Sequence, residues 1–155
     1  MRLCLVLLAL LLCAAADVAV AACTGTNRVT GKSQTVQEIY RTGTSHPRRF
    51  FAEATYDRSS GRPQIIYYSR YASAPGHFKS FVRQHECCHH LEHRDEISAN
   101  CCALRRMGLS ASGLAALRSY IVSRDVNSQT VVDYAGQGAL FWSKTASRCL
   151  SQASR

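Results

Sequence analysis

The sequence predicts an α+β fold weighted toward helix, and three observations support this prediction. Two short apolar segments, residues 49–56 and 63–69, flank a turn-forming DRSSGR stretch. Several later segments carry apolar residues at helical spacing and are bounded by Gly or by capping residues. The composition, with 46% hydrophobic and 19% charged residues, is typical of a globular chain rather than a disordered one.

The first 22 residues are expected to be a secretory signal peptide that lies outside the fold. Arg2 precedes an apolar run over residues 3–12, and small residues suited to cleavage follow. The run is too short to act as a permanent membrane span. The rest, residues 23–155, is expected to form one secreted or periplasmic domain. Val-Ala-Ala before Cys23 also resembles a lipoprotein box, so a lipid on Cys23 is an alternative.

The β part is expected to be an antiparallel hairpin. Residues 49–56 and 63–69 are its predicted strands, and residues 57–62 form the loop that joins them. The segment at residues 35–40 fits either a short helix or a short strand. The rest of the polar stretch up to residue 48 carries no pattern of its own.

Four helices are expected after the hairpin. Residues 75–91 form the first, because apolar side chains recur there at spacings of 3–4 residues. A second helix begins near Asp95, which can act as its N-cap, and ends before Gly108. Residues 109–122 and residues 136–153 are the third and fourth expected helices, the third capped by a serine.

The cysteines agree with export. Of eight, two lie in the signal segment and six remain, which indicates up to three disulfides. Sequence neighbours rarely bond each other, so one of Cys87 and Cys88 can bond one of Cys101 and Cys102 and clamp the first two helices together. The alternative, in which thiolates bind a metal themselves, is disfavoured in an oxidising compartment.

The chain is strongly basic, with a net charge of +9. This charge favours contact with anionic surroundings, such as an envelope surface, or serves solubility alone. No basic run alternates with stacking aromatic residues, so the sequence predicts no nucleic-acid partner.

Residues 85–89 read His-Glu-Cys-Cys-His, an H-E-x-x-H motif on a predicted helix. Positions i and i+4 share a helix face, so His85 and His89 can both direct an imidazole nitrogen at one Zn²⁺ ion. Glu86 lies about 100° further round the helix, where its carboxylate can take a proton from a water that zinc acidifies. The plainer interpretation is a solvated helix face that carries two unrelated histidines.

The third ligand has to come from a segment that folds back onto this helix. At a rise of 1.5 Å per residue, His93 would lie roughly 12 Å along the axis from His85, beyond the reach of zinc bonds of about 2 Å. Glu96 on the next helix can supply the carboxylate. Asn100, four residues further on the same face, can hydrogen-bond a ligand imidazole.

These residues resemble a known family. HECCHH at residues 85–90 and EISANCCA at residues 96–103 resemble the gluzincin pattern. They are most similar to the small bacterial neutral zinc metallopeptidase-like proteins, which read HECxHH and then ExxADCxA. The resemblance covers about residues 65–106 and implies a minimal zincin-like helical core after the hairpin.

The resemblance also implies roles for individual residues. Zinc would be bound by His85, His89 and Glu96, and Glu86 would be the catalytic base. The strand at residues 63–69 would border the cleft, where a peptide substrate could add as a further strand.

The sequence departs from the family pattern at two points. Asn100 stands where the family has Asp, and it offers a ligand histidine a neutral partner. No Gly or Pro interrupts the stretch from His89 to Glu96, so the site requires a backbone reversal there. A metzincin pattern would need Gly at position 92 and a ligand at position 95; since Glu92 occupies the first of these, Glu96 is favoured over Asp95.

The expected function is that of a secreted zinc-dependent peptidase with a peptide or protein substrate. The rival is a non-catalytic, disulfide-clamped exported binding or structural protein, with or without structural zinc. Tyr120 and Tyr134 are candidates for stabilising an oxyanion, and the sequence favours neither.

Overall fold

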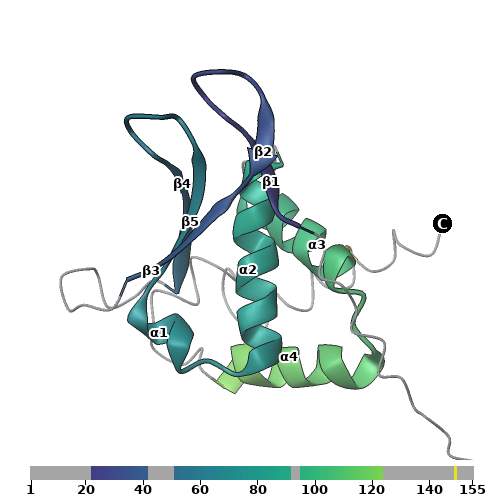
Figure 1. Ribbon diagram of the computed structural model, residues 1–155. Helices are drawn as coiled ribbons and strands as arrows, with labels where there is room; N and C mark the ends of the chain where they lie inside the picture. The colour runs from purple at the N-terminus through teal and green to yellow at the C-terminus, as the bar shows by residue number, and fades with distance from the viewer. Residues whose placement is uncertain (1–21, 42–50, 92–94, 124–148, 150–155) are drawn as a thin grey trace, which may run out of the picture.

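The computed structural model describes residues 22–41, 51–91, 95–123 and 149 of the 155-residue chain. These residues form five strands in two small sheets and four helices, so the predicted α+β class is confirmed (Figure 1). The expected signal segment, except for Ala22, lies outside the described residues. So does the expected fourth helix at residues 136–153, except for Cys149.

A polar hairpin opens the described chain. β1 (Thr24–Thr26) pairs antiparallel with β2 (Ser33–Thr35). In the turn, the Asn27 side-chain carbonyl accepts hydrogen bonds from the backbone N–H groups of Val29 and Thr30, at 2.8 and 2.9 Å. The sequence pattern did not predict this hairpin, because its strands are only 3 residues long and lack apolar alternation.

The second sheet has the strand order β3-β5-β4. β4 (Ala52–Tyr56) and β5 (Pro63–Tyr67) form the expected antiparallel hairpin. β3 (Gln37–Tyr40) pairs in parallel with β5, so the ambiguous segment at residues 35–40 contains a strand. β5 is buried along its whole length because it has a neighbour on each side.

The central place of β5 corrects one expectation. Both of its edges already pair with other strands, so a peptide cannot add to it as a further strand. Local patterning could not reveal this, because β3 and β5 are far apart in the sequence and pair through the backbone. Among the described residues, the outer edges of β3 and β4 are the unpaired ones in this sheet.

Helix α2 (Gly76–His90) packs between the sheets and the other helices (Figure 1). It follows a single helical turn, α1 (Ser69–Ala72), which was not expected. Phe78, Phe81 and Val82 of α2 are buried in a core with Ile65 of β5. The apolar side chains that recur at helical spacing therefore form the face of α2 that packs against the sheet, and this packing holds the helix in place.

The remaining helices lie along α2. α3 (Glu96–Met107) lies beside its C-terminal half, and α4 (Ala111–Ser123) lies near its N-terminal end (Figure 1). Gly108 ends α3 with a left-handed φ of 53°, as its position predicted. Ser110 caps α4 by accepting a hydrogen bond from the Gly113 N–H at 3.2 Å.

The six cysteines from Cys23 onward form three disulfides: Cys23–Cys87, Cys88–Cys102 and Cys101–Cys149. Neighbouring cysteines do not bond each other, and Cys88–Cys102 joins α2 to α3, so the expected clamp is confirmed. The alternative of thiolate metal ligands is wrong, because none of these sulfurs is left as a thiolate. Cys23 Sγ bonds to Cys87, and a lipid thioether would need that same sulfur.

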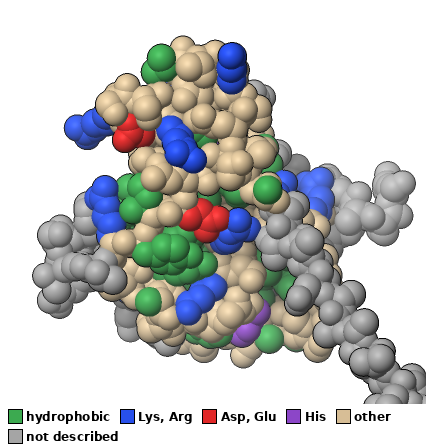
Figure 2. Space-filling view, in the orientation of Figure 1, with side chains coloured by type: hydrophobic (Ala, Val, Ile, Leu, Met, Phe, Trp, Pro, Cys, Tyr) green, Lys and Arg blue, Asp and Glu red, His purple; other side chains and the backbone are tan. Residues whose placement is uncertain are grey.

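On the face seen in Figure 2, the basic side chains of the described residues are not gathered in one stripe. Lys and Arg lie there at separate points between hydrophobic and polar groups. This face therefore offers no continuous basic track for a polyanion. None of the described helices is long and apolar enough to cross a membrane.

Candidate metal centre

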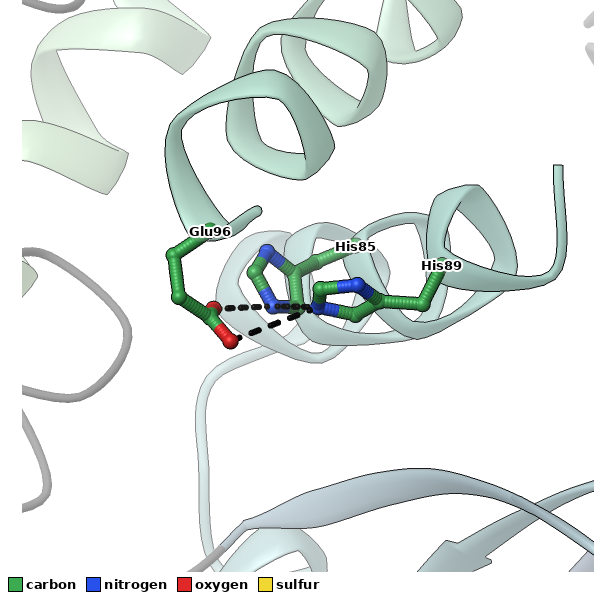
Figure 3. A group of neighbouring side chains, drawn as sticks. All are labelled: His85, His89 and Glu96. Atoms are coloured by element: carbon green, nitrogen blue, oxygen red, sulfur yellow. Dashed lines mark hydrogen bonds and ion pairs between the residues drawn. The ribbon is translucent and has the colours of Figure 1, made fainter. Parts of the chain in front are cut away.

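Three potential metal ligands converge where α2 meets α3. His85 and His89 lie on one face of α2, and Glu96 is the first residue of α3 (Figure 3). The two Nε2 atoms are 3.0 Å apart, and Glu96 carboxylate oxygens lie 3.0 Å from His85 Nε2 and 3.6 Å from His89 Nε2. The three ligand atoms all lie within 4.8 Å of one another, so this group could hold a metal ion.

The backbone reverses between the two helices, as the site requires. α2 ends at His90, and Leu91 leaves the helical region with φ −95° and ψ 29°. α3 starts afresh from Asp95, whose side chain accepts a hydrogen bond from the Ser98 N–H at 2.9 Å. This cap fixes the start of α3 and therefore the position of the Glu96 backbone, from which its side chain extends.

Asn100 orients one of the histidines. Its Oδ1 lies 2.8 Å from His85 Nδ1, and both side chains are buried. An amide oxygen only accepts, so Nδ1–H donates to Asn100, and Nε2 is the ring nitrogen that faces His89 and Glu96. Asn100 therefore makes the predicted hydrogen bond to the His85 imidazole.

The ligand group is buried on one side and open on the other. The side chain of His85 is 1% exposed, that of His89 18% and that of Glu96 54%. Burial alone would raise the pKa of Glu96, but hydrogen bonds with His85 and His89 outweigh it and lower the pKa to about 2. Glu96 is therefore an anion at neutral pH, as a metal ligand must be.

Glu86 occupies a different position from the ligands. It is 3% exposed and does not belong to the group of converging ligand atoms. It follows His85 directly on α2, so its side chain leaves the helix about 100° further round. Its carboxylate is therefore not one of the converging ligand atoms, although its backbone directly adjoins that of His85.

The spacing and chemistry of the donors fit zinc. Two ligand atoms bound tetrahedrally to one Zn²⁺ at about 2.0–2.1 Å lie roughly 3.3 Å apart. His85 Nε2 lies 3.0 Å from His89 Nε2 and 3.0 Å from Glu96 Oε2, slightly below that value, and His89 Nε2 lies 3.6 Å from the other Glu96 oxygen, Oε1. Two imidazole nitrogens and one carboxylate also form a donor set that zinc accepts.

Other candidate residues lie outside the group. Asp95 is used as the N-cap of α3. His90 is buried and its Nε2–H donates to the Gln64 carbonyl at 2.9 Å, while burial lowers the pKa of His90. Tyr120 packs on Phe78, with ring centroids 4.7 Å apart, near the opposite end of α2. Tyr134 lies outside the described residues.

One supporting contact was not found from the sequence. Arg106 Nε of α3 donates to the Gln84 side-chain carbonyl of α2 at 2.7 Å, and Gln84 is buried. This bond ties the two ligand-bearing helices together on a second side. In the sequence, the contact is indicated only by the polar residue Gln84 directly before His85. This signal is too weak to predict a partner 22 residues away.

Comparison with known proteins adds no assignment: no family model, curated protein or solved structure matches this chain.

Proposed function

We propose that this protein is a secreted or periplasmic zinc-dependent peptidase of the gluzincin type. The observation that carries the proposal is the convergence of His85, His89 and Glu96 within 4.8 Å, beside a buried Glu86. Two helices and the Cys88–Cys102 disulfide hold these side chains in place. Three disulfides agree with an oxidising compartment.

The residues divide the chemistry among them. Zn²⁺, when bound by His85, His89 and Glu96, would lower the pKa of a water and polarise a carbonyl group. Glu86 would take the proton from that water and return it to the leaving amine. Asn100 would keep the His85 Nε2 lone pair directed at the metal.

The exposure of the ligands favours a catalytic site over a structural one. Structural zinc sites are closed by four protein ligands, whereas a catalytic site keeps one position open. Among the residues that the structure describes, the group has three ligand residues, and the Glu96 side chain is 54% exposed. A substrate carbonyl could therefore reach the metal from the Glu96 side.

The sheet offers a place for an extended substrate. Of the two edge strands, β4 packs more closely against α2, and its outer edge is unpaired among the described residues. An extended peptide could pair with that edge through backbone hydrogen bonds, and this would supply affinity with little demand on side chains. The proposed partner is accordingly a peptide or an unfolded protein segment, not a nucleic acid.

Glu86→Gln tests the mechanism. This substitution keeps the size of the side chain and removes the base, so zinc content should stay equal to wild type while cleavage of denatured casein falls at least about 100-fold. Zinc is measured by metal analysis and cleavage by peptide release. Asp57→Asn makes the same chemical change in the exposed β4–β5 turn and should leave both values unchanged.

Two results would contradict the proposal. Unchanged cleavage by Glu86→Gln would exclude Glu86 as the base. A wild-type protein that holds zinc but cleaves no peptide bond would favour the rival class, a disulfide-clamped binding protein.

A further inference from the structure

The disulfide that joins the two ligand-bearing helices closes a loop that contains two of the three candidate ligands. Cys88 directly precedes the ligand His89, and Cys102 lies two residues beyond Asn100. With a sequence separation of 14, this bond closes a loop that contains His89, Glu96 and Asn100. The loop thus contains the α3 carboxylate that approaches both histidines and the α3 amide that orients His85.

This disulfide is also the one of the three that includes a partly exposed cysteine. Cys23, Cys87, Cys88, Cys101 and Cys149 are all buried, whereas Cys102 is partly exposed. Thiol–disulfide exchange needs access of a thiolate to one sulfur of the bond. The other two disulfides are formed entirely by buried residues, so attack is expected first at Cys102.

We propose that Cys88–Cys102 is a redox-sensitive restraint, whose reduction weakens metal binding at His85, His89 and Glu96. The inference rests on the metal site proposed above. Closing a loop of this size restricts the conformations open to the chain, and the restriction is lost on reduction. The first turn of α3 can then leave α2 more easily, and Glu96 leaves with it.

The rest of the interface explains why reduction would loosen the site without unfolding the domain. The Gln84–Arg106 hydrogen bond and the buried Ala99, Ala103 and Leu104 of α3 remain when the disulfide opens. We therefore expect metal affinity at least about tenfold weaker in the reduced form, with helix content preserved.

The reaction needs a thiol reductant, and its electrons balance. A thiolate attacks Cys102 Sγ, the S–S bond breaks, and Cys88 leaves as a thiolate that takes up a proton. A second thiolate attacks the mixed disulfide and releases Cys102. The disulfide gains two electrons and two protons, and two reductant thiols are oxidised to one disulfide.

The test compares Co²⁺ and Zn²⁺ affinity in oxidised wild type and in Cys88→Ser/Cys102→Ser, by competition with a chromophoric chelator. The variant lacks the bond and adds no thiolate ligand, so its binding should be at least about tenfold weaker. Cys23→Ser/Cys87→Ser is the matched control: it removes a disulfide at the same turn of α2 that does not reach α3, and it should bind as wild type does.

A second measurement keeps the test decisive if the variant fails to fold, as circular dichroism would report. Wild type is equilibrated in glutathione buffers of graded reducing strength, alkylated and mapped by mass spectrometry. Cys88 and Cys102 should be modified first, and added Zn²⁺ should shift their opening to stronger reducing conditions, because metal binding and disulfide formation favour the same state.

The outcomes separate this inference from the proposed function. If oxidised wild type binds metal and the Cys88→Ser/Cys102→Ser variant binds equally well or better, the redox inference is wrong and the metal site stands. Opening of another disulfide first, or no effect of Zn²⁺ on reduction, also overturns it. If oxidised wild type binds neither ion, the metal site itself fails.

Discussion

A single buried amide fixes the chemistry of the histidine that it contacts. Asn100 is 0% exposed, and its Oδ1 has His85 Nδ1 as a neighbour at 2.8 Å. Because the amide is neutral, it orients His85 without adding negative charge next to the candidate metal centre. A carboxylate in its place would make the imidazole a stronger donor to the metal.

Removal of this amide should weaken metal binding. Asn100→Ala leaves the buried His85 N–H without its partner, at a cost of about 1–3 kcal/mol in the free energy of unfolding. The imidazole also loses its fixed tautomer, so zinc affinity should fall about 10–100-fold, as measured by chelator competition. Asn100→Asp should bind zinc at least as tightly as wild type.

Leu104→Ala distinguishes orientation of His85 from general destabilisation. Leu104 is buried on the same helix, and its truncation should cost about 2–5 kcal/mol of stability while zinc affinity stays unchanged in the folded protein. Wild-type affinity in Asn100→Ala would mean that this amide does not control the ligand.

The site residues are visible in the sequence because each depends on local geometry. The four-residue spacing of His85 and His89, and of Glu96 and Asn100, follows from the helical repeat alone. Whether Glu96 faces the histidines is a question about the chain between the helices. The spacing of residues along one helix cannot answer that question. It also cannot predict that Glu86 is buried, with 3% of its surface exposed.

At the scale of elements, the start of α3 determines which carboxylate joins the two histidines in the candidate metal centre. Asp95 caps the helix, and Glu96 is its first residue, so the two adjacent carboxylates have different roles. The cap was predictable, since an acidic residue before a helical pattern and Gly108 after it are local signals. The choice between the two carboxylates could not be made from the sequence alone. The missing Gly at position 92 favoured Glu96 as the ligand but did not exclude Asp95.

Substitution of each carboxylate by its amide should separate the roles. Asp95→Asn keeps a good N-cap, so both helix stability and zinc affinity should stay close to wild type. Glu96→Gln removes an anionic ligand and should lower zinc affinity on the order of 100-fold. Isothermal titration of the two metal-free variants with Zn²⁺ measures this; a larger loss in Asp95→Asn would reverse the assignment.

The strands were less predictable than the helices, for a physical reason. The β4–β5 hairpin is local, and its apolar strands flank a turn. β3 pairs in parallel with β5, with Ile39 opposite Ile66, and nothing near either residue in the sequence indicates the other. Non-local backbone pairing decides which strand lies at an edge, and for that reason the expectation that a peptide could add to the strand at residues 63–69 was wrong.

At the scale of the whole molecule, covalent bonds hold the fold around the site. Cys23–Cys87 ties the first hairpin to α2, Cys88–Cys102 ties α2 to α3, and Cys101 anchors Cys149. Six cysteines allow 15 pairings. From the sequence, only the disulfide between α2 and α3 could be limited to a few pairings. Both helices were predicted, and the expected ligands His85, His89 and Glu96 required them to lie side by side.

This framework predicts that the protein stays folded without its metal. Each disulfide is worth about 2–4 kcal/mol, and aromatic and aliphatic side chains from the sheets and helices form a core of their own. EDTA should therefore leave the circular dichroism spectrum unchanged at room temperature. Zn²⁺ at 100 times its Kd should add about 2.7 kcal/mol to the free energy of unfolding.

That stabilisation should appear as a rise in Tm of a few degrees per kcal/mol, measured with and without Zn²⁺. His89→Ala is the control: it lacks a ligand that is 18% exposed, so its fold should persist while its Tm no longer responds to zinc. Unfolding by EDTA would mean that the metal holds the fold together, as in a structural site. If the site is an open, catalytic centre in a disulfide-linked fold, metal removal and re-addition should instead be reversible and leave the fold unchanged.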